Sequence, residues 1–276
     1  MTVTPLSYRI FRYTLIVVCG LIMVAPLVYM VSRSLMSPSE VQAFPAPLLP
    51  RVPQFSNYAA AFAYLSPQVI ANSFVFAIGV VALQLVLSLP AAFALAKIPF
   101  RYTGALMAVL ILPVFIPANF TLIPLFIEVY RLGWLNTYAG LIVPMAAQVT
   151  FAVLLFRQFF AGLPDGLIEA ARIDGASWFR VFVSITLPLA RPVLATYVSV
   201  SFLTAWNMYI WPQVIATDPS LQVINVALAP LAGGQYSQVS PAIGLAGAVI
   251  ALVPVLIVFL VFQRWYVRGV VGTGVE

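Results

Sequence analysis

Six long apolar stretches constrain the fold of this chain more than any motif does. They cover residues 13–33, 69–96, 103–128, 137–158, 193–215 and 242–263. A helix needs about 20 apolar residues to cross the hydrocarbon core of a bilayer. In lipid the backbone polar groups must bond within the protein, and a helix satisfies them all. We therefore predict an all-α integral membrane protein with six transmembrane helices, forming a single membrane domain over residues 1–276.

The overall composition agrees with a membrane protein and excludes several kinds of chemistry. Only 7% of the residues are charged, against about 25% in soluble domains. The chain has no histidine, which excludes a histidine-based catalytic triad and a histidine metal site. It has one lysine, Lys97, followed by Ile98, so no P-loop motif is present. We expect no enzymatic activity and no metal or other cofactor in this chain.

The distribution of basic residues predicts the orientation in the membrane. If the N-terminus is cytoplasmic, ten of the thirteen basic residues lie inside and three lie outside. The three outside are Arg33, Arg51 and Arg131. Basic residues accumulate in cytoplasmic loops, so we predict that both termini and residues 163–191 are cytoplasmic. The first apolar run is long enough to span and lacks a small-residue cleavage site, so we expect no cleavable signal peptide.

Residues 163–191 form the longest polar segment on the predicted cytoplasmic side. Pro164 suits the first turn of a helix, where a missing N–H costs nothing. Gly175 can end that helix, because glycine tolerates the left-handed conformation of a C-terminal cap. Ser177 can cap a second short helix that begins with Trp178. The sequence therefore predicts two short helices separated by a turn at Asp174-Gly175.

The same segment resembles the EAA motif of the membrane-spanning subunits of ABC importers. The pattern E-A-A, three residues, G, nine residues, I-x-L-P is matched without a gap by Glu169, Ala170, Ala171, Gly175, Ile185, Leu187 and Pro188. The resemblance implies that this EAA segment (residues 163–191) contacts a separate ATPase subunit, with Arg172 and Asp174 also at the contact. The alternative is an ordinary amphipathic cytoplasmic loop.

Further stretches narrow the resemblance to carbohydrate-type permeases. They are residues 136–144, 154–164, 206–212 and 263–271. The chain is similar to the second of the paired permeases of the maltose and glycerol-3-phosphate systems. This resemblance implies four kinds of partner. They are a second, different permease, two ATPase subunits that bind the ATP and magnesium, an extracytoplasmic solute-binding protein, and the lipid of a bacterial or archaeal cytoplasmic membrane.

The solute is left open between two classes. Many sugar permeases have an acid after the Trp-Asn pair, whereas this chain has Met208. Tyr209 occurs at the equivalent position of glycerol-3-phosphate permeases, which the chain resembles here. Glycerol phosphate or a phosphodiester is one alternative, and a neutral sugar, disaccharide or polyol is the other.

The predicted spans contain neutral polar residues and no buried acid. These are Gln84, Asn119, Gln148, Asn207 and Tyr209. Ion-coupled carriers bury an ionisable group in the membrane, so the energy source should lie in another subunit. We expect Asn119, Gln148, Asn207 and Tyr209 to line the translocation pathway, because amide and phenol groups can bond to solute hydroxyls. The alternative is that they bond helices to one another.

The loop of residues 217–241 is predicted to lie outside, between the fifth and sixth spans. Residues 223–231 are apolar enough to pack on the membrane surface. Gly233, Gly234, Gln235 and Tyr236 follow as a small polar tip. In the maltose-type permease that the chain resembles, the equivalent loop enters the binding protein, which implies a binding-protein contact here. A solvent-exposed connector is the alternative.

Other classes of function fit the sequence less well. An intramembrane enzyme would need a catalytic set, and the isolated acids supply none. A self-sufficient secondary carrier would need ion-coupling residues in its spans. An ABC permease for another solute class, such as amino acids or metals, remains compatible with the EAA pattern.

Overall fold

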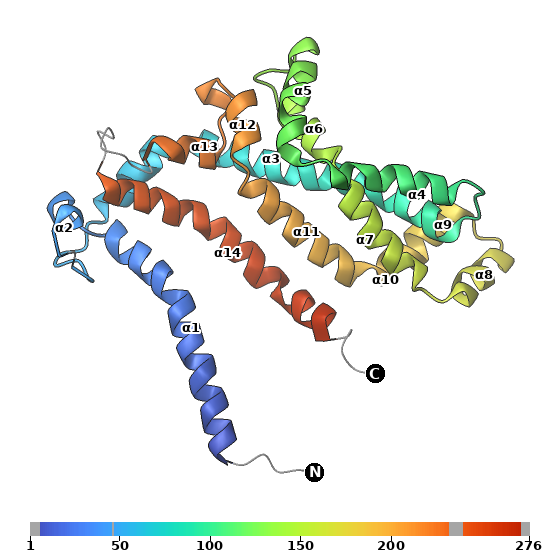
Figure 1. The fold of residues 1–276 in the computed structure, drawn as a ribbon, viewed down its shortest axis with the longest axis horizontal. Coiled ribbons are helices and arrows are strands. Elements are labelled where there is room, and N and C mark those ends of the chain that lie inside the picture. Colours follow the sequence, from blue (N-terminus) through green and yellow to red (C-terminus); the bar gives the residue numbers. More distant parts are fainter. Residues whose placement is uncertain (1–5, 46, 232–239, 272–276) are drawn as a thin grey trace. The chain divides into compact units, whose positions relative to one another are not determined.

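The computed structural model describes residues 6–45, 47–231 and 240–271, and every regular element in these ranges is helical (Figure 1). The prediction of an all-α fold is therefore confirmed. The chain forms two compact units. The first comprises residues 1–67 and 227–253, and the second comprises residues 68–226 and 254–276.

The first unit is built from helices that expose much apolar surface. It contains α1 (Leu6–Ser34), α2 (Pro38–Gln42), the first part of α3 (Ser56–Lys97), η4 (Ala229–Leu231) and the first part of α14 (Pro241–Val271). None of the most apolar window of α1 is buried within the chain. Side chains such as Met23 are instead exposed, as on a helix that faces lipid or another subunit.

The connection between α1 and α3 is ordered by a capping box. The Ser37 hydroxyl accepts from the Glu40 backbone N–H, and the Glu40 carboxylate accepts from the Ser37 N–H at 2.9 Å. The other Glu40 oxygen accepts from the Arg51 N–H at 2.9 Å. These backbone hydrogen bonds favour the ionised carboxylate and hold the pKa of Glu40 below its usual value.

The second unit carries most of the helices. They are the rest of α3, α4 (Thr103–Ile111), η1 (Leu112–Phe115), α5 (Ala118–Arg131), α6 (Tyr138–Ala146), α7 (Thr150–Ala161), α8 (Asp165–Ile173), α9 (Trp178–Val181), the π-helix η2 (Phe182–Thr186), α10 (Leu187–Leu189), α11 (Arg191–Trp206), α12 (Ile210–Ile215) and η3 (Pro219–Leu221). The short helix α13 (Ile224–Leu228) crosses the boundary between the units. Helices α8 and α9 lie together at one end of the second unit (Figure 1).

Three helices are each long and apolar enough to cross a membrane, namely α1, α3 and α14. Three further pairs of helices qualify if each pair counts as one span, which gives six within the described residues. The two parts of these pairs meet at bends of 103° near Pro117, 46° near Gln148 and 76° near Ala190. Broken helices are tolerated in membrane proteins where the protein surrounds the exposed backbone.

Helix α3 begins earlier than the predicted second span. The span was predicted to begin at residue 69, but the helical conformation starts at Ser56. Alanine-rich residues at 59–63 favour a helix there. Ser66 alone departs from helical geometry, with φ 54° and ψ 151°. It precedes Pro67, whose ring disfavours the α conformation in the preceding residue.

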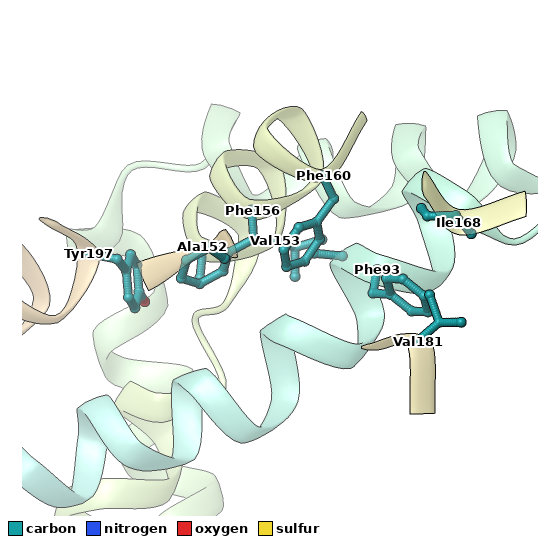
Figure 2. Close-up of a cluster of buried hydrophobic side chains, with 10 residues drawn as sticks. Phe93, Ala152, Val153, Phe156, Phe160, Ile168, Val181 and Tyr197 are labelled. Carbon is teal, nitrogen blue, oxygen red and sulfur yellow. The ribbon is translucent and has the colours of Figure 1, made fainter. Parts of the chain in front are cut away.

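A buried cluster in the second unit joins the EAA segment to the membrane helices. Figure 2 shows Phe93 of α3 among Phe160 of α7, Ile168 of α8 and Val181 of α9. The Phe93 ring lies 6.3 Å from that of Phe160 and 5.2 Å from that of Phe182. These contacts are at the separations at which aromatic pairs attract. The cluster therefore fixes α8 and α9 against α3 and α7.

Candidate functional site

The first half of the EAA segment forms helix α8 and ends as predicted. Asp174 is the C-terminal cap, and Gly175 has a positive φ of 82°. The Gly175 N–H donates to the Arg172 carbonyl and the Ala176 N–H to the Ala171 carbonyl, which together make a Schellman motif. Pro164 precedes the first helical residue, Asp165, instead of occupying the first turn. The turn at Asp174-Gly175 therefore reflects backbone geometry that glycine adopts without strain.

The second half begins with the predicted cap. The Ser177 hydroxyl accepts from the Arg180 N–H at 3.2 Å and starts helix α9. The Arg172 side chain stabilises the same turn. Its guanidinium donates to the Ala176 carbonyl at 2.8 Å and lies 4.7 Å from the centre of the Trp178 ring. Arg172 was expected at the ATPase contact, and in this structure it binds the turn itself.

The outer face of the EAA segment presents exposed side chains. Glu169, Ala170, Asp174 and Gly175 are all exposed, while Ala171 is half-buried. Apolar residues are exposed beside them: Ile173 is 85% exposed and Phe179 is 74% exposed. Exposed apolar residues next to charges are typical of a surface that binds a protein partner. The inner face is buried through Ile168 and Val181.

The I-x-L-P part of the motif forms the end of the EAA segment, just before α11. Ile185 lies in the π-helix η2 and is half-buried, and Leu187 and Pro188 lie in α10. A π-helix is rare and often marks a functional position. The chain then bends by 76° into α11. The motif thus leads directly into one of the membrane helices.

Lys97 is a residue of this region that the sequence reasoning did not select. Its side chain is 4% exposed, at the C-terminal end of α3. The Lys97 ammonium donates to the Leu163 carbonyl at 2.7 Å and to the Asp165 carboxylate at 2.6 Å. A signal existed in the sequence, because Lys97 is the only lysine in the chain. Its partners lie 66 and 68 positions away, so the sequence could not identify them.

The predicted pathway residues all lie where helices are interrupted. Asn119 follows the break at Pro117, Gln148 lies between α6 and α7, and Asn207 and Tyr209 lie between α11 and α12. We call residues 116–119, 147–149 and 207–209 the break region. A helix break leaves backbone N–H and C=O groups without helical partners, and transporters use such groups to bind solutes.

Two cavities lie at the break region, and Gln148 lines both. One cavity of about 200 Å³ is lined by Asn119, Gln148, Met208 and Trp211 among others. The other, of about 180 Å³, includes Gln84, Gln148, Ser201 and Met208. The structure therefore brings Asn119 and Gln148 to one cavity, and their role in the pathway stays a prediction. The residues lining these two cavities are neutral.

Asn207 and Tyr209 do not line either of these two cavities. The Asn207 amide donates to the Leu203 carbonyl of its own helix at 2.8 Å. Met208, between them, lines both cavities. The structure therefore places Met208 at both cavities, and the pathway role of Asn207 and Tyr209 stays a prediction. The sequence contained a signal for Met208, because many sugar permeases have an acid at this position.

Gln84 bonds three helices together beside the second cavity. Its side-chain oxygen accepts from the Tyr197 hydroxyl at 2.8 Å and from the Ser201 hydroxyl at 2.6 Å, both on α11. Its amide donates to the Met145 carbonyl of α6 at 3.3 Å. Gln84 is 8% exposed. It thus connects α3 and α11 to the α6 end of a helix break.

The loop of residues 217–241, predicted to lie outside, begins with a segment held by side-chain hydrogen bonds. We call residues 217–226 the anchored segment. Asn72, fully buried in α3, donates to the Ser220 and Gln222 carbonyls at 2.9 and 3.0 Å. The Asn136 side-chain oxygen accepts from the Asp218 N–H at 2.8 Å. The anchored segment is therefore bound to the helices of its own unit.

The expectation that residues 223–231 pack on the membrane surface is wrong. Val223 and Ile224 are 2% and 1% exposed, and Leu231 is 2% exposed. These side chains are buried within the protein because the backbone of this stretch bonds to its neighbours, as in the bond from the Ile224 N–H to the Ser73 hydroxyl at 2.7 Å. Gly233, Gly234, Gln235 and Tyr236, expected at the loop tip, lie outside the described residues.

The comparison with protein families shows to which family this chain belongs. The profile of binding-protein-dependent transport system inner membrane components matches residues 84–272, which is more than half of the chain. The chain belongs to this family. As a permease of a binding-protein-dependent importer, it is a transporter subunit. The matched range includes the EAA segment, the break region and the anchored segment.

Individual relatives in this permease family match along almost the whole chain. The chain is 30% identical to the sn-glycerol-3-phosphate transport system permease protein UgpE of Rhizobium meliloti (strain 1021), over 98% of each chain. It is 31% identical to the protein of the same name in Agrobacterium fabrum (strain C58 / ATCC 33970), over 94% of this chain and 95% of the relative.

A solved structure supports the permease fold. The permease is similar, with a TM-score of 0.83 and 25% identity, to a chain in the crystal structure of a bacterial ABC transporter involved in the import of the acidic polysaccharide alginate. The match covers 96% of this chain and 100% of that chain. The prediction of an ABC importer permease fold is therefore confirmed.

Proposed function

We propose that this permease carries a hydroxyl-rich solute with an anionic group, of the glycerol-3-phosphate type, across the cytoplasmic membrane. The observation that carries the proposal is the pair of uncharged cavities at the break region, each lined in part by amide and hydroxyl side chains, in a chain whose relatives are named for glycerol-3-phosphate transport. Amide, hydroxyl and backbone groups at these breaks can bond to solute hydroxyls and phosphate oxygens. The charge of the phosphate would be neutralised by the second permease or by the binding protein.

Reconstitution of the complete transporter tests the solute class. Proteoliposomes would contain this chain, the second permease, the ATPase subunits and external binding protein. We expect ATP-dependent uptake of sn-glycerol-3-phosphate and little uptake of maltose or glycerol. Uptake of a neutral sugar with none of the phosphate ester would overturn the proposal in favour of the sugar alternative.

The EAA segment is proposed to transmit the work of ATP hydrolysis by a partner. ATP and magnesium would be bound by the ATPase subunits and not by this chain. The exposed face that carries Glu169, Ala170 and Gly175, with Ile173 and Phe179 beside it, supports a protein contact. Glu169→Lys reverses the charge offered to the partner and should abolish uptake and solute-stimulated ATPase activity while the complex still assembles. Wild-type uptake by this variant would remove the EAA segment from the coupling role.

The coupling role of the EAA segment also implies the orientation of the chain in the membrane. Both termini and the EAA segment would face the cytoplasm, in agreement with the ten-to-three distribution of basic residues. On a Cys19→Ser background, Ser177→Cys should react with an impermeant maleimide only from the cytoplasmic side. Ser220→Cys in the anchored segment should react only from outside. The reverse pattern would contradict the orientation.

The proposed binding-protein contact concerns Gly233, Gly234, Gln235 and Tyr236. If this tip enters the binding protein, deletion of Gly233 to Gln235 should abolish uptake while the assembled complex keeps its basal ATPase rate. Nearly unchanged transport would instead identify the tip as a connector.

A further inference from the structure

We propose that Lys97 is a positioning residue that ties the EAA segment to α3, so that a displacement of α8 reaches the translocation cavities through α3. The inference rests on the proposed coupling function of the EAA segment. Together with the buried cluster around Phe93, the Lys97 contact makes a non-covalent route between the ATPase contact and the pathway, beside the covalent route through residues 174–190.

The contact made by Lys97 is short, and it joins a buried ammonium side chain to an exposed carboxylate. The ammonium bonds to the Leu163 carbonyl and to the Asp165 carboxylate, at the beginning of α8. The Lys97 side chain is 4% exposed and that of Asp165 is 79% exposed. A buried ammonium is stable only with such partners. This contact therefore holds the end of α3 to the start of α8, in addition to the packing of Ile168 in the cluster around Phe93.

Helix α8 borders a cavity beside the contact between Lys97 and Asp165. A cavity of about 640 Å³ separates parts of α8 from the end of α3 and the loop that follows it, and Lys97, Asp165, Glu169 and Trp178 are among the residues that line it. Part of the face of α8 borders this open space, so on this side the Lys97 contact adds to the packing of Ile168 and Ala171 in the buried cluster.

Helix α3 connects Lys97 to the translocation cavities. Gln84 lies thirteen residues earlier in α3, about 20 Å along the helix axis at 1.5 Å per residue. The helix is unbroken between them, although Pro90 lies in the interval. At Gln84 the helix bonds to Tyr197 and Ser201 of α11 and to the Met145 carbonyl. A shift of α3 along its axis would therefore reach residues beside both cavities.

The covalent route reaches the same residues by a less direct path. It runs from α8 through the π-helix η2 and the 76° bend into α11. Tyr197 and Ser201 on α11 then bond to Gln84. The two routes thus form a closed ring from α8 to Gln84 and back. Coupling between distant sites is carried by chains of packed and hydrogen-bonded elements of this kind.

Lys97→Met tests the inference in the complete reconstituted transporter. The variant keeps the length of the side chain and removes the ammonium. We expect the complex to assemble and to hydrolyse ATP at its basal rate, while the ATP consumed per solute transported rises at least about fivefold, the low end of typical allosteric coupling. Asp165→Asn, which leaves the bond to Leu163, should have a smaller effect. Lys97→Arg should restore the wild-type ratio.

Arg101→Met provides the matched control. Arg101 lies in the loop that follows Lys97 and α3, but its guanidinium stacks on the neighbouring Tyr102 ring at 4.2 Å. Loss of this charge should leave the ratio of ATP to solute unchanged. A wild-type ratio in Lys97→Met, or an equal change in Arg101→Met, would overturn the inference. If the wild-type transporter itself takes up no solute, the proposed function fails and not the role of Lys97.

A covalent replacement of the contact separates positioning from folding. Lys97→Cys and Asp165→Cys would be combined on the Cys19→Ser background and joined with a short bismaleimide. We expect poor coupling before the cross-link and recovery of uptake per ATP after it. Failure of the cross-link to restore coupling would overturn the inference. So would a failure of both Lys97→Met and the cysteine pair to assemble, because a purely structural role would then account for Lys97.

Discussion

The EAA segment and the anchored segment are both polar stretches between apolar helices, yet they use their side chains in opposite ways. In the EAA segment most hydrogen bonds join residues within five positions, and Glu169, Ile173 and Phe179 face outward. In the anchored segment the bonds reach Asn72, Ser73 and Asn136, up to 151 positions away. A segment that must bind a partner keeps its surface free, whereas a segment that completes the fold bonds to its own helices.

Around the break region, some side chains bond to the protein's own helices and others face open space. Gln84 fixes one wall of a cavity by bonding to α6 and α11. Met208 and Gln148 face the open volume of both cavities. This difference predicts that changes in the anchored segment reduce stability, changes in the EAA segment reduce coupling, and changes at Met208 alter solute preference.

The largest effect should come from Asn72→Leu. The change leaves the Ser220 and Gln222 carbonyls and the Tyr138 hydroxyl without their partner. These bonds are part-buried, and a fully buried polar group left unpaired costs about 1 to 3 kcal/mol, so we expect a total loss of about 3 kcal/mol, measured by thermal unfolding of the purified complex. The control is Thr196→Val, whose hydroxyl bonds only to Pro192 in its own helix. Equal stability of the two variants would contradict the distinction between the segments.

Gly175→Val should mainly reduce coupling. A β-carbon on Gly175 would meet no atom within 4 Å, so the cost comes from the φ of 82° and not from a clash. A β-branched residue in this conformation costs on the order of 1 to 3 kcal/mol. We expect assembled complexes with reduced solute-stimulated ATPase activity. Gly175→Asn is the control, because asparagine tolerates positive φ, and it should retain most of the activity. Failure of Gly175→Val to assemble would show that Gly175 serves only the fold.

Met208→Asp should change solute preference. A carboxylate in cavities with neutral lining residues would repel an anionic solute. We expect the transport KM for glycerol-3-phosphate to rise about tenfold, which corresponds to about 1.4 kcal/mol. Met208→Leu has a similar volume and should change the KM little. Asn207→Ala should also have little effect, and an Asn207→Ala effect larger than that of Met208→Asp would restore Asn207 to the pathway.

The smallest effect should be the pH dependence of the anchored segment. The Ser220 N–H donates to the Asp218 carboxylate at 2.8 Å and lowers the pKa of Asp218 from its usual value. A lowered pKa in the folded state means that the stabilisation is present above the unfolded pKa of about 3.9 and is lost as the pH falls through the folded value. The difference in melting temperature between wild type and Asp218→Ala should be constant from pH 8 to 5 and shrink below about pH 4. A difference that grows in acid would contradict this.

Much of the EAA segment was predictable because its structure is local. The turn at Gly175 and the cap at Ser177 depend on bonds that span no more than five residues. The breaks near Asn119 and Gln148 were partly predictable, because Pro117 and Pro144 interrupt or border apolar runs. The early start of α3 was missed, because the proline-rich composition of residues 34–68 masked a short alanine-rich helix.

The sequence by itself determined the membrane class, the all-helical fold and the position of the EAA segment. Hydropathy and capping act over one helix or one turn, so the chain carries this information locally. Only the tertiary structure decided that Lys97 binds Asp165, that Met208 faces the cavities and that Val223 and Ile224 are buried. These outcomes depend on which helices pack together, and the residues concerned are often more than 60 positions apart.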